Sequence, residues 1–167
     1  SESAIFIDDT PGLGLLEIRA KARRFKLQYD IQLVIIDYLQ LMEGRSAENR
    51  QQEISSISRG LKALARELNV PVIAVSQLNR SVETREGHTP RMSDLRESGS
   101  IEQDADVIML LHRADYYDPT KNPGEVDVDV AKQRNGPTGK IKLTFRNQFL
   151  RFENFANDAS IDSFDTL

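Results

Sequence analysis

The chain has 167 residues, with 22 basic against 26 acidic side chains, and a formal net charge of −4. This length can form a globular domain with a real core, and a composition of 39% hydrophobic and 29% charged residues excludes fibrous and wholly disordered proteins. The absence of cysteine excludes disulfides, thiolate catalysis and cysteine-ligated zinc, and two histidines are too few for a histidine metal cluster. The apolar runs, such as residues 33–36, are too short to cross a membrane, and no secretory signal is present.

The charge is unevenly distributed along the chain. Residues 19–26 contain five basic side chains and no acidic one, and residues 131–151 contain six basic side chains and no acidic one. Such blocks can serve a polyanion even in an acidic protein, although the block at 19–26 is also typical of an ordinary solvated helix face. Residues 156–167 are predicted to form a loose acidic tail.

The first half of the chain predicts alternating strands and helices. A short strand is expected over residues 4–7, and apolar residues spaced by three and four predict helices over 15–25 and 54–68. The uninterrupted apolar runs at 33–36 and 70–75 are typical of strands buried on both faces of a parallel sheet.

The second half begins with a long polar stretch and ends in hairpins. A third buried strand is expected at 105–111, and period-two alternation at 126–130 and 141–145 predicts antiparallel strands joined through 133–139, before a last strand at 149–155. The predicted fold class is α/β, with a mixed, mainly parallel sheet and carboxy-terminal antiparallel hairpins.

Two polar residues follow the predicted parallel strands, at the edge where open α/β sheets bind ligands. Asp37 ends one apolar run, and a carboxylate there can hold the water shell of Mg²⁺. Gln77 follows the other and can contact a terminal phosphate or orient water. The alternatives are that Asp37 only caps a turn and that Gln77 is an ordinary polar residue at a strand end.

A phosphate-binding loop is absent from this sequence. Neither G-x-x-x-x-G-K-[ST] nor G-x-G-x-x-G occurs among the nine glycines. The chain is therefore either unrelated to nucleotide enzymes or the later part of one.

Two further segments are candidates for phosphate contacts. Lys132 and Arg134 belong to a predicted hairpin tip that can present arginine to a neighbour's phosphate, although a solvated basic turn is the simpler alternative. Residues 96–100 are rich in donors and could surround a phosphate with backbone N–H groups and Arg96, or could simply lead into the next helix.

Four segments, LVIIDYLQLM, VPVIAVSQLNR, LRESGSIEQDADVIMLLHR and KQRNGPTG, resemble in this order the bacterial replicative DNA helicases of the DnaB family. The resemblance extends from Ile5 to about Phe155. It implies a RecA-like P-loop NTPase motor, an ATP-dependent helicase that moves as a hexameric ring on single-stranded DNA and unwinds duplex at the fork. It also implies a cytoplasmic, nucleoid-associated bacterial protein with no membrane partner.

The resemblance assigns roles to the candidate residues. Asp37 matches the Walker B carboxylate that holds Mg²⁺ through water, and Gln77 matches the sensor of the γ-phosphate of ATP. Lys132 and Arg134 match the finger that reaches the neighbouring subunit's ATP. The DNA-contacting loop of the family matches Arg96, Glu97 and Gly99.

Parts of the family pattern are missing from this sequence. The resemblance implies that the P-loop, the water-activating glutamate and the collar domain that binds primase precede Ser1. The motor domain over 1–155 would then be incomplete on its amino-terminal side, with an exposed apolar sheet face, and would not hydrolyse ATP alone. Primase and the helicase loader would be partners of the parent protein. The alternatives are another RecA-type ATPase, such as a recombinase, and a non-catalytic interaction module.

Overall fold

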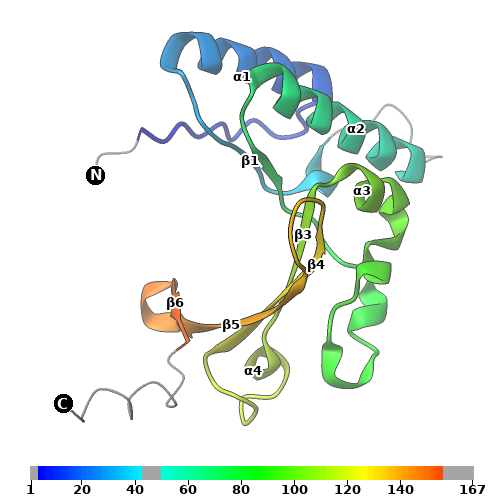
Figure 1. Cartoon of the computed structure of the whole chain (residues 1–167), viewed down its shortest axis with the longest axis vertical. Coiled ribbons are helices and arrows are strands. Elements are labelled where there is room, and N and C mark those ends of the chain that lie inside the picture. The colour runs from blue at the N-terminus through cyan, green and yellow to red at the C-terminus, as the bar shows by residue number, and fades with distance from the viewer. Residues whose placement is uncertain (1–3, 43–49, 156–167) are drawn as a thin grey trace. The chain divides into compact units, whose positions relative to one another are not determined.

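The computed structural model describes residues 4–42 and 50–155 (Figure 1). The chain divides into two compact units, which are described separately: residues 1–79 with 95–105, and residues 80–94 with 106–167. The predicted acidic tail, 156–167, lies outside the described residues.

The first unit packs helices against a short parallel sheet. Its elements are α1 (Leu15–Tyr29), β1 (Val34–Ile36), the 3-10 helix η1 (Leu39–Leu41), α2 (Arg50–Leu68), β2 (Val72–Ala74) and α3 (Gly99–Asp104). Strands β1 and β2 pair in parallel, with Val34 opposite Val72. Figure 1 shows α1 and α2 on the same side of β1.

The core of this unit lies between the helices and the sheet. The predicted apolar face of α2 is confirmed, because Ile57, Leu61, Leu64 and Leu68 are all buried. Helix α1 approaches α2 closely at Gly60, where an added Cβ atom would lie 2.1 Å from Cδ2 of Leu15.

The outer face of the β1–β2 sheet is exposed. Ile35 is 61% exposed and Ile73 is 46% exposed, so the predicted burial of both faces is wrong for the described chain. The reason is that the helices cover only one face, and the exposed apolar face implied by the resemblance is present. The strand predicted at residues 4–7 does not form; Phe6 instead stacks on Tyr29 of α1, with ring centroids 4.4 Å apart.

The second unit is built on an antiparallel sheet with the strand order β3-β4-β5-β6. Its elements after the loop region are β3 (Val107–His112), α4 (Ala114–Tyr117), β4 (Glu125–Gln133), β5 (Gly139–Arg146), the 3-10 helix η6 (Asn147–Phe149) and β6 (Arg151–Asn154). The predicted hairpin through 133–139 is confirmed as the β4–β5 connection.

Strand β3 differs from its predicted environment. Ile108 and Leu110 are buried while Met109 and Leu111 are more than half exposed, so only one face of β3 is covered within the described chain. It pairs with β4 in antiparallel fashion. The mixed α/β class is confirmed, but among the described strands only β1 and β2 are parallel, so the expected predominance of parallel pairing is wrong.

The polar stretch that follows β2 forms short helical turns: η3 (Arg80–Val82), η4 (Glu86–His88) and η5 (Met92–Ser98). Arg85 braces this region through two hydrogen bonds, of 2.7 and 2.8 Å, to the buried carboxylate of Asp94. None of the helices in the described ranges is long and apolar enough to cross a membrane.

Candidate functional site

Asp37 and Gln77 lie at the same edge of the parallel sheet. Asp37 directly follows β1, and Gln77 is the third residue after β2. The two strand ends are level because Ile36 pairs with Ala74, and the backbone N–H of Val75 donates to the Ile36 carbonyl at 2.9 Å. Both side chains are exposed at this carboxyl edge.

A third polar residue, Gln40, joins the two strand ends. Its Oε1 accepts a hydrogen bond from the Gln77 backbone N–H at 3.2 Å, and its Nε2 donates to the Gln77 carbonyl at 3.3 Å and to the Ser76 hydroxyl at 3.1 Å. Sequence analysis did not single out Gln40, because nothing in its spacing distinguishes it from a solvated glutamine. Its only signal was its place in the segment after Asp37.

The chemistry of this edge suits a magnesium-bound nucleotide. Mg²⁺ prefers oxygen ligands, keeps several waters and binds through one or two carboxylates together with phosphates. Asp37 offers such a carboxylate and Gln77 an amide beside it. Within residues 4–42 and 50–155, no group of three or more histidine, aspartate or glutamate side chains could hold a metal, which argues against an all-protein cage in this part.

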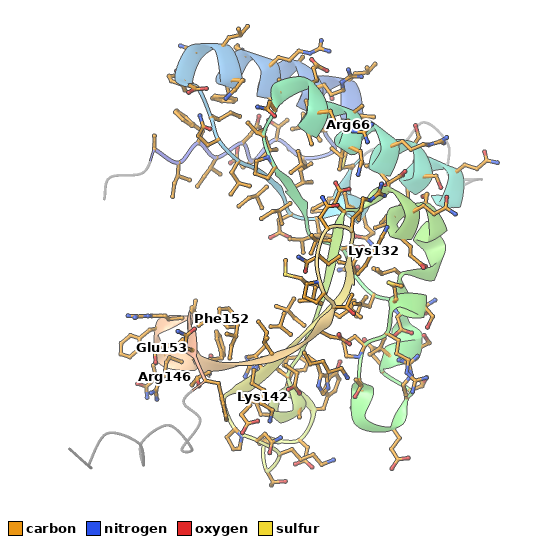
Figure 2. The ribbon with its side chains drawn as sticks, viewed as in Figure 1. Arg66, Lys132, Lys142, Arg146, Phe152 and Glu153 are labelled. Carbon is orange, nitrogen blue, oxygen red and sulfur yellow. The ribbon has the colours of Figure 1, made fainter. Side chains whose placement is uncertain are left out.

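The hairpin residues Lys132 and Arg134 belong to the second unit. Lys132 lies within β4, opposite Ile108, rather than at the hairpin tip (Figure 2). Arg134 is the first residue after β4, and its backbone N–H donates to the Asp106 carbonyl at 2.8 Å. The Arg134 Nε also lies 3.2 Å from the Asp106 carboxylate, a partner that sequence analysis missed.

The segment containing Arg96, Glu97 and Gly99 is helical in its backbone. η5 ends at Ser98 and α3 begins at Gly99, so the expected flexible loop is replaced by helical turns. The side chains of these three residues lie outside what the structure describes. Helix α3 is fastened to α2 by a 2.8 Å hydrogen bond between the hydroxyls of Ser100 and Ser55.

The basic block of the second unit is matched by carboxylates on neighbouring strands. Lys142 lies 2.6 Å from Glu125 across the β4–β5 pair, and Arg146 lies 3.1 Å from Glu153 across the β5–β6 pair. Figure 2 shows Arg146 and Glu153 close together at the β5–β6 end of the sheet. These ion pairs reduce the positive field that the basic count alone suggested.

The basic block on α1 is likewise paired. Arg23 and Arg19 both contact Glu67 of α2, and together they lower the pKa of that carboxyl to about 2. Lys21 lies 2.6 Å from Asp8. The block therefore matches the solvated-face alternative better than a bare polyanion site.

The chain has clear relatives among known proteins. Residues 1–154 match the family described as DnaB-like helicase C terminal domain. The replicative DNA helicase DnaC of Bacillus subtilis is 54% identical over 167 residues, covering 96% of this chain and 37% of that protein. The replicative DNA helicase DnaB of Geobacillus stearothermophilus is 55% identical over 157 residues, covering 92% and 35%. The chain thus spans about a third of the length of these relatives.

Solved structures show the same likeness. A DnaB-like replicative helicase, solved to show its interactions with primase, superposes with a TM-score of 0.81 and 46% identity, over 87% of this chain and 36% of that chain. A second structure, which is an isolated ATPase domain, gives the same TM-score and identity over 87% and 52%. The RecA-like α/β fold implied by the resemblance is confirmed by these structures.

Proposed function

The chain belongs to the DnaB-like helicase C-terminal domain family, and we propose on this basis that it forms part of the motor of a replicative DNA helicase. In this proposal the parent protein uses ATP to move along single-stranded DNA and to unwind the duplex at the replication fork. The observation that carries the proposal is the placement of Asp37 and Gln77 at the carboxyl ends of two paired parallel strands.

Each residue at this edge has a distinct role in the proposal. The Asp37 carboxylate holds the magnesium ion of bound ATP through the metal's water shell, and Gln77 contacts the terminal phosphate through its amide. Mg²⁺ supplies neutralisation of charge on the phosphates when it is bound. The rigid β1–β2 pair keeps the two side chains at one edge, so little ordering remains to be done when the nucleotide binds.

The hairpin residues complete the site of a neighbouring subunit. In a hexameric ring one head-to-tail interface is repeated, so a residue that protrudes from one subunit meets the same site on the next. Arg134 offers a planar, permanently charged donor for the charge that develops on the transferred phosphoryl group, and Lys132 adds a second cation. Two contacts to Asp106 support a defined position for Arg134.

Arg96, Glu97 and Gly99 contact the backbone of single-stranded DNA in this proposal. Fastening of the following helix to α2 supports transmission of movement from the nucleotide edge to this segment. In the parent protein we also propose primase and a helicase loader as partners, and the bacterial cytoplasm, beside the nucleoid, as the location. The 167-residue sequence holds no phosphate-binding loop, so we expect no ATP turnover by this chain alone.

A strand-displacement assay on the full-length protein tests the proposed function. We expect ATP-dependent release of the labelled strand from a forked duplex and no release with a non-hydrolysable ATP analogue. Homologous strand exchange without displacement would instead establish the recombinase alternative. Absence of ATP turnover and of both DNA reactions in the full-length protein would leave the non-catalytic interaction module.

A further inference from the structure

The end of β2 is held by a side chain rather than by the sheet. The backbone ladder between the two strand extensions ends with Val75, which donates to Ile36 and accepts from the Leu39 N–H, both at 2.9 Å. Beyond that point the backbone N–H and carbonyl of Gln77 are both bound by the side-chain amide of Gln40. Gln40 therefore acts as one more peptide unit of the ladder, with an acceptor and a donor in the places of a neighbouring strand.

We propose that Gln40 is a positioning residue for Gln77, and that its amide fixes the backbone of Gln77 so that the Gln77 side chain stays at the Asp37 edge. This inference rests on the proposed function, in which Gln77 contacts the terminal phosphate of ATP. Gln40 itself touches neither nucleotide nor metal in this proposal.

The location of Gln40 makes the coupling direct. Gln40 lies in η1, three residues after Asp37, so its main chain is continuous with the strand that carries the carboxylate. Its Nε2 also bonds the Ser76 hydroxyl at 3.1 Å, and that hydroxyl in turn lies 3.3 Å from the Gln77 carbonyl. The two side chains proposed to act on ATP are thus linked through one half-buried amide.

The expected effect is on turnover rather than on nucleotide affinity. A displacement of about 1 Å in a catalytic group can cost on the order of a hundredfold in rate. Most nucleotide binding in this family of sites comes from phosphate contacts that Gln40 does not make. We therefore expect Gln40→Leu to lower kcat by about tenfold or more while ATP affinity stays within about twofold.

A double-mutant cycle in the full-length protein separates positioning from a general structural role. Gln40→Leu, Gln77→Ala and the double variant are compared for DNA-stimulated ATP turnover. If Gln40 acts through Gln77, Gln40→Leu should lower kcat by less than about twofold once Gln77 is alanine. Gln32→Leu is the matched control, because the Gln32 amide donates to the Asp30 carbonyl at 2.8 Å, before β1 begins, and its loss should leave turnover unchanged.

The isosteric change Gln40→Glu guards against misfolding. Glutamate keeps an acceptor for the Gln77 N–H but loses the donor to the Gln77 carbonyl, so kcat should again fall by about tenfold. If Gln40→Leu does not assemble, Gln40→Glu takes its place in the cycle, with ring formation as the check.

The outcomes are distinct. Unchanged turnover in Gln77→Ala would overturn the role of Gln77 in the proposed function, and the present inference with it. Impaired Gln77→Ala with a silent Gln40 variant, or with effects that simply multiply in the double variant, would overturn the positioning role alone.

Discussion

Arg134 is joined to Asp106 by both its backbone and its side chain. The backbone N–H donates to the Asp106 carbonyl at 2.8 Å, and Nε lies 3.2 Å from the Asp106 carboxylate. Asp106 immediately precedes β3, so the start of the hairpin is anchored on the strand that pairs with β4. Strands β4 and β5 are the two inner strands of this sheet, and the hairpin is therefore not at the far edge as sequence reasoning assumed.

Replacement of Arg134 tests whether the nucleotide site is shared between subunits. In the full-length protein we expect Arg134→Ala to bind ATP and form rings but to hydrolyse ATP on the order of 10³-fold more slowly, the usual cost of losing an arginine finger. Arg134→Lys should rescue little, because lysine lacks the planar fork. Lys140→Ala is the control: this exposed cation of the same hairpin lies 3.9 Å from Asp129 and should matter little.

Mixing Arg134→Ala subunits with Asp37→Asn subunits makes that test decisive. Some interfaces in a mixed ring join an intact Asp37 to an intact neighbouring Arg134, so part of the ATP turnover should return. No recovery in rings shown to be mixed would argue that Arg134 acts within its own subunit.

Replacement of Arg96 tests the DNA assignment. Arg96→Ala should weaken binding to single-stranded DNA about equally for all base sequences, because phosphate contacts carry no base information. Loss of one phosphate contact should lower the slope of log affinity against log salt by about 0.7. The control is Arg24→Ala, on the basic face of α1, which should change neither quantity. A defect confined to particular base sequences would contradict contact with the backbone.

The Arg85–Asp94 brace predicts a pH dependence for residues 80–94. Hydrogen bonds from Arg85, assisted by the Arg91 N–H, hold the pKa of the Asp94 carboxyl below its ordinary value of 3.8, although burial opposes this shift. Because the pKa is lower in the folded state, the brace stabilises fully above the ordinary value and is lost as the pH falls through the lowered value. Hydrogen exchange, referenced at each pH to an unfolded peptide, should show protection of 80–94 declining below pH 3.8.

Asp94→Ala should remove that protection at neutral pH, while Glu153→Gln, which breaks a more exposed ion pair, should have little effect. Protection that is unchanged in Asp94→Ala would show that other contacts hold these turns.

Periodicity predicted the elements that bury one face. The three-and-four spacing of α2 and the valines that alternate with aspartates in β4 depend only on which side of an element meets the core, and that is written locally. The apolar runs of β1 and β3 were misleading, because an apolar residue does not specify whether its own chain covers it. Ile35 and Met109 are exposed in the described chain although their neighbours in sequence are equally apolar.

The site was predictable only in part for a similar reason. Asp37 and Gln77 could be found because each ends an apolar run, and parallel pairing brings such ends together. Gln40 and Asp106 could not, since their importance depends on contacts with residues 37 and 28 positions away, respectively. Nothing in the local sequence specifies such partners.

The central claim is that Asp37 holds the metal of an ATP-driven motor at the edge of the β1–β2 pair. The most direct measurement is Mg²⁺-dependent, DNA-stimulated ATP turnover of full-length Asp37→Asn beside Asp9→Asn, an exposed carboxylate ahead of α1. The account predicts that Asp37→Asn folds and forms rings but loses on the order of hundredfold or more in rate, while Asp9→Asn behaves as the unmodified protein. Full turnover in Asp37→Asn would contradict the account and reduce Asp37 to the cap of a turn.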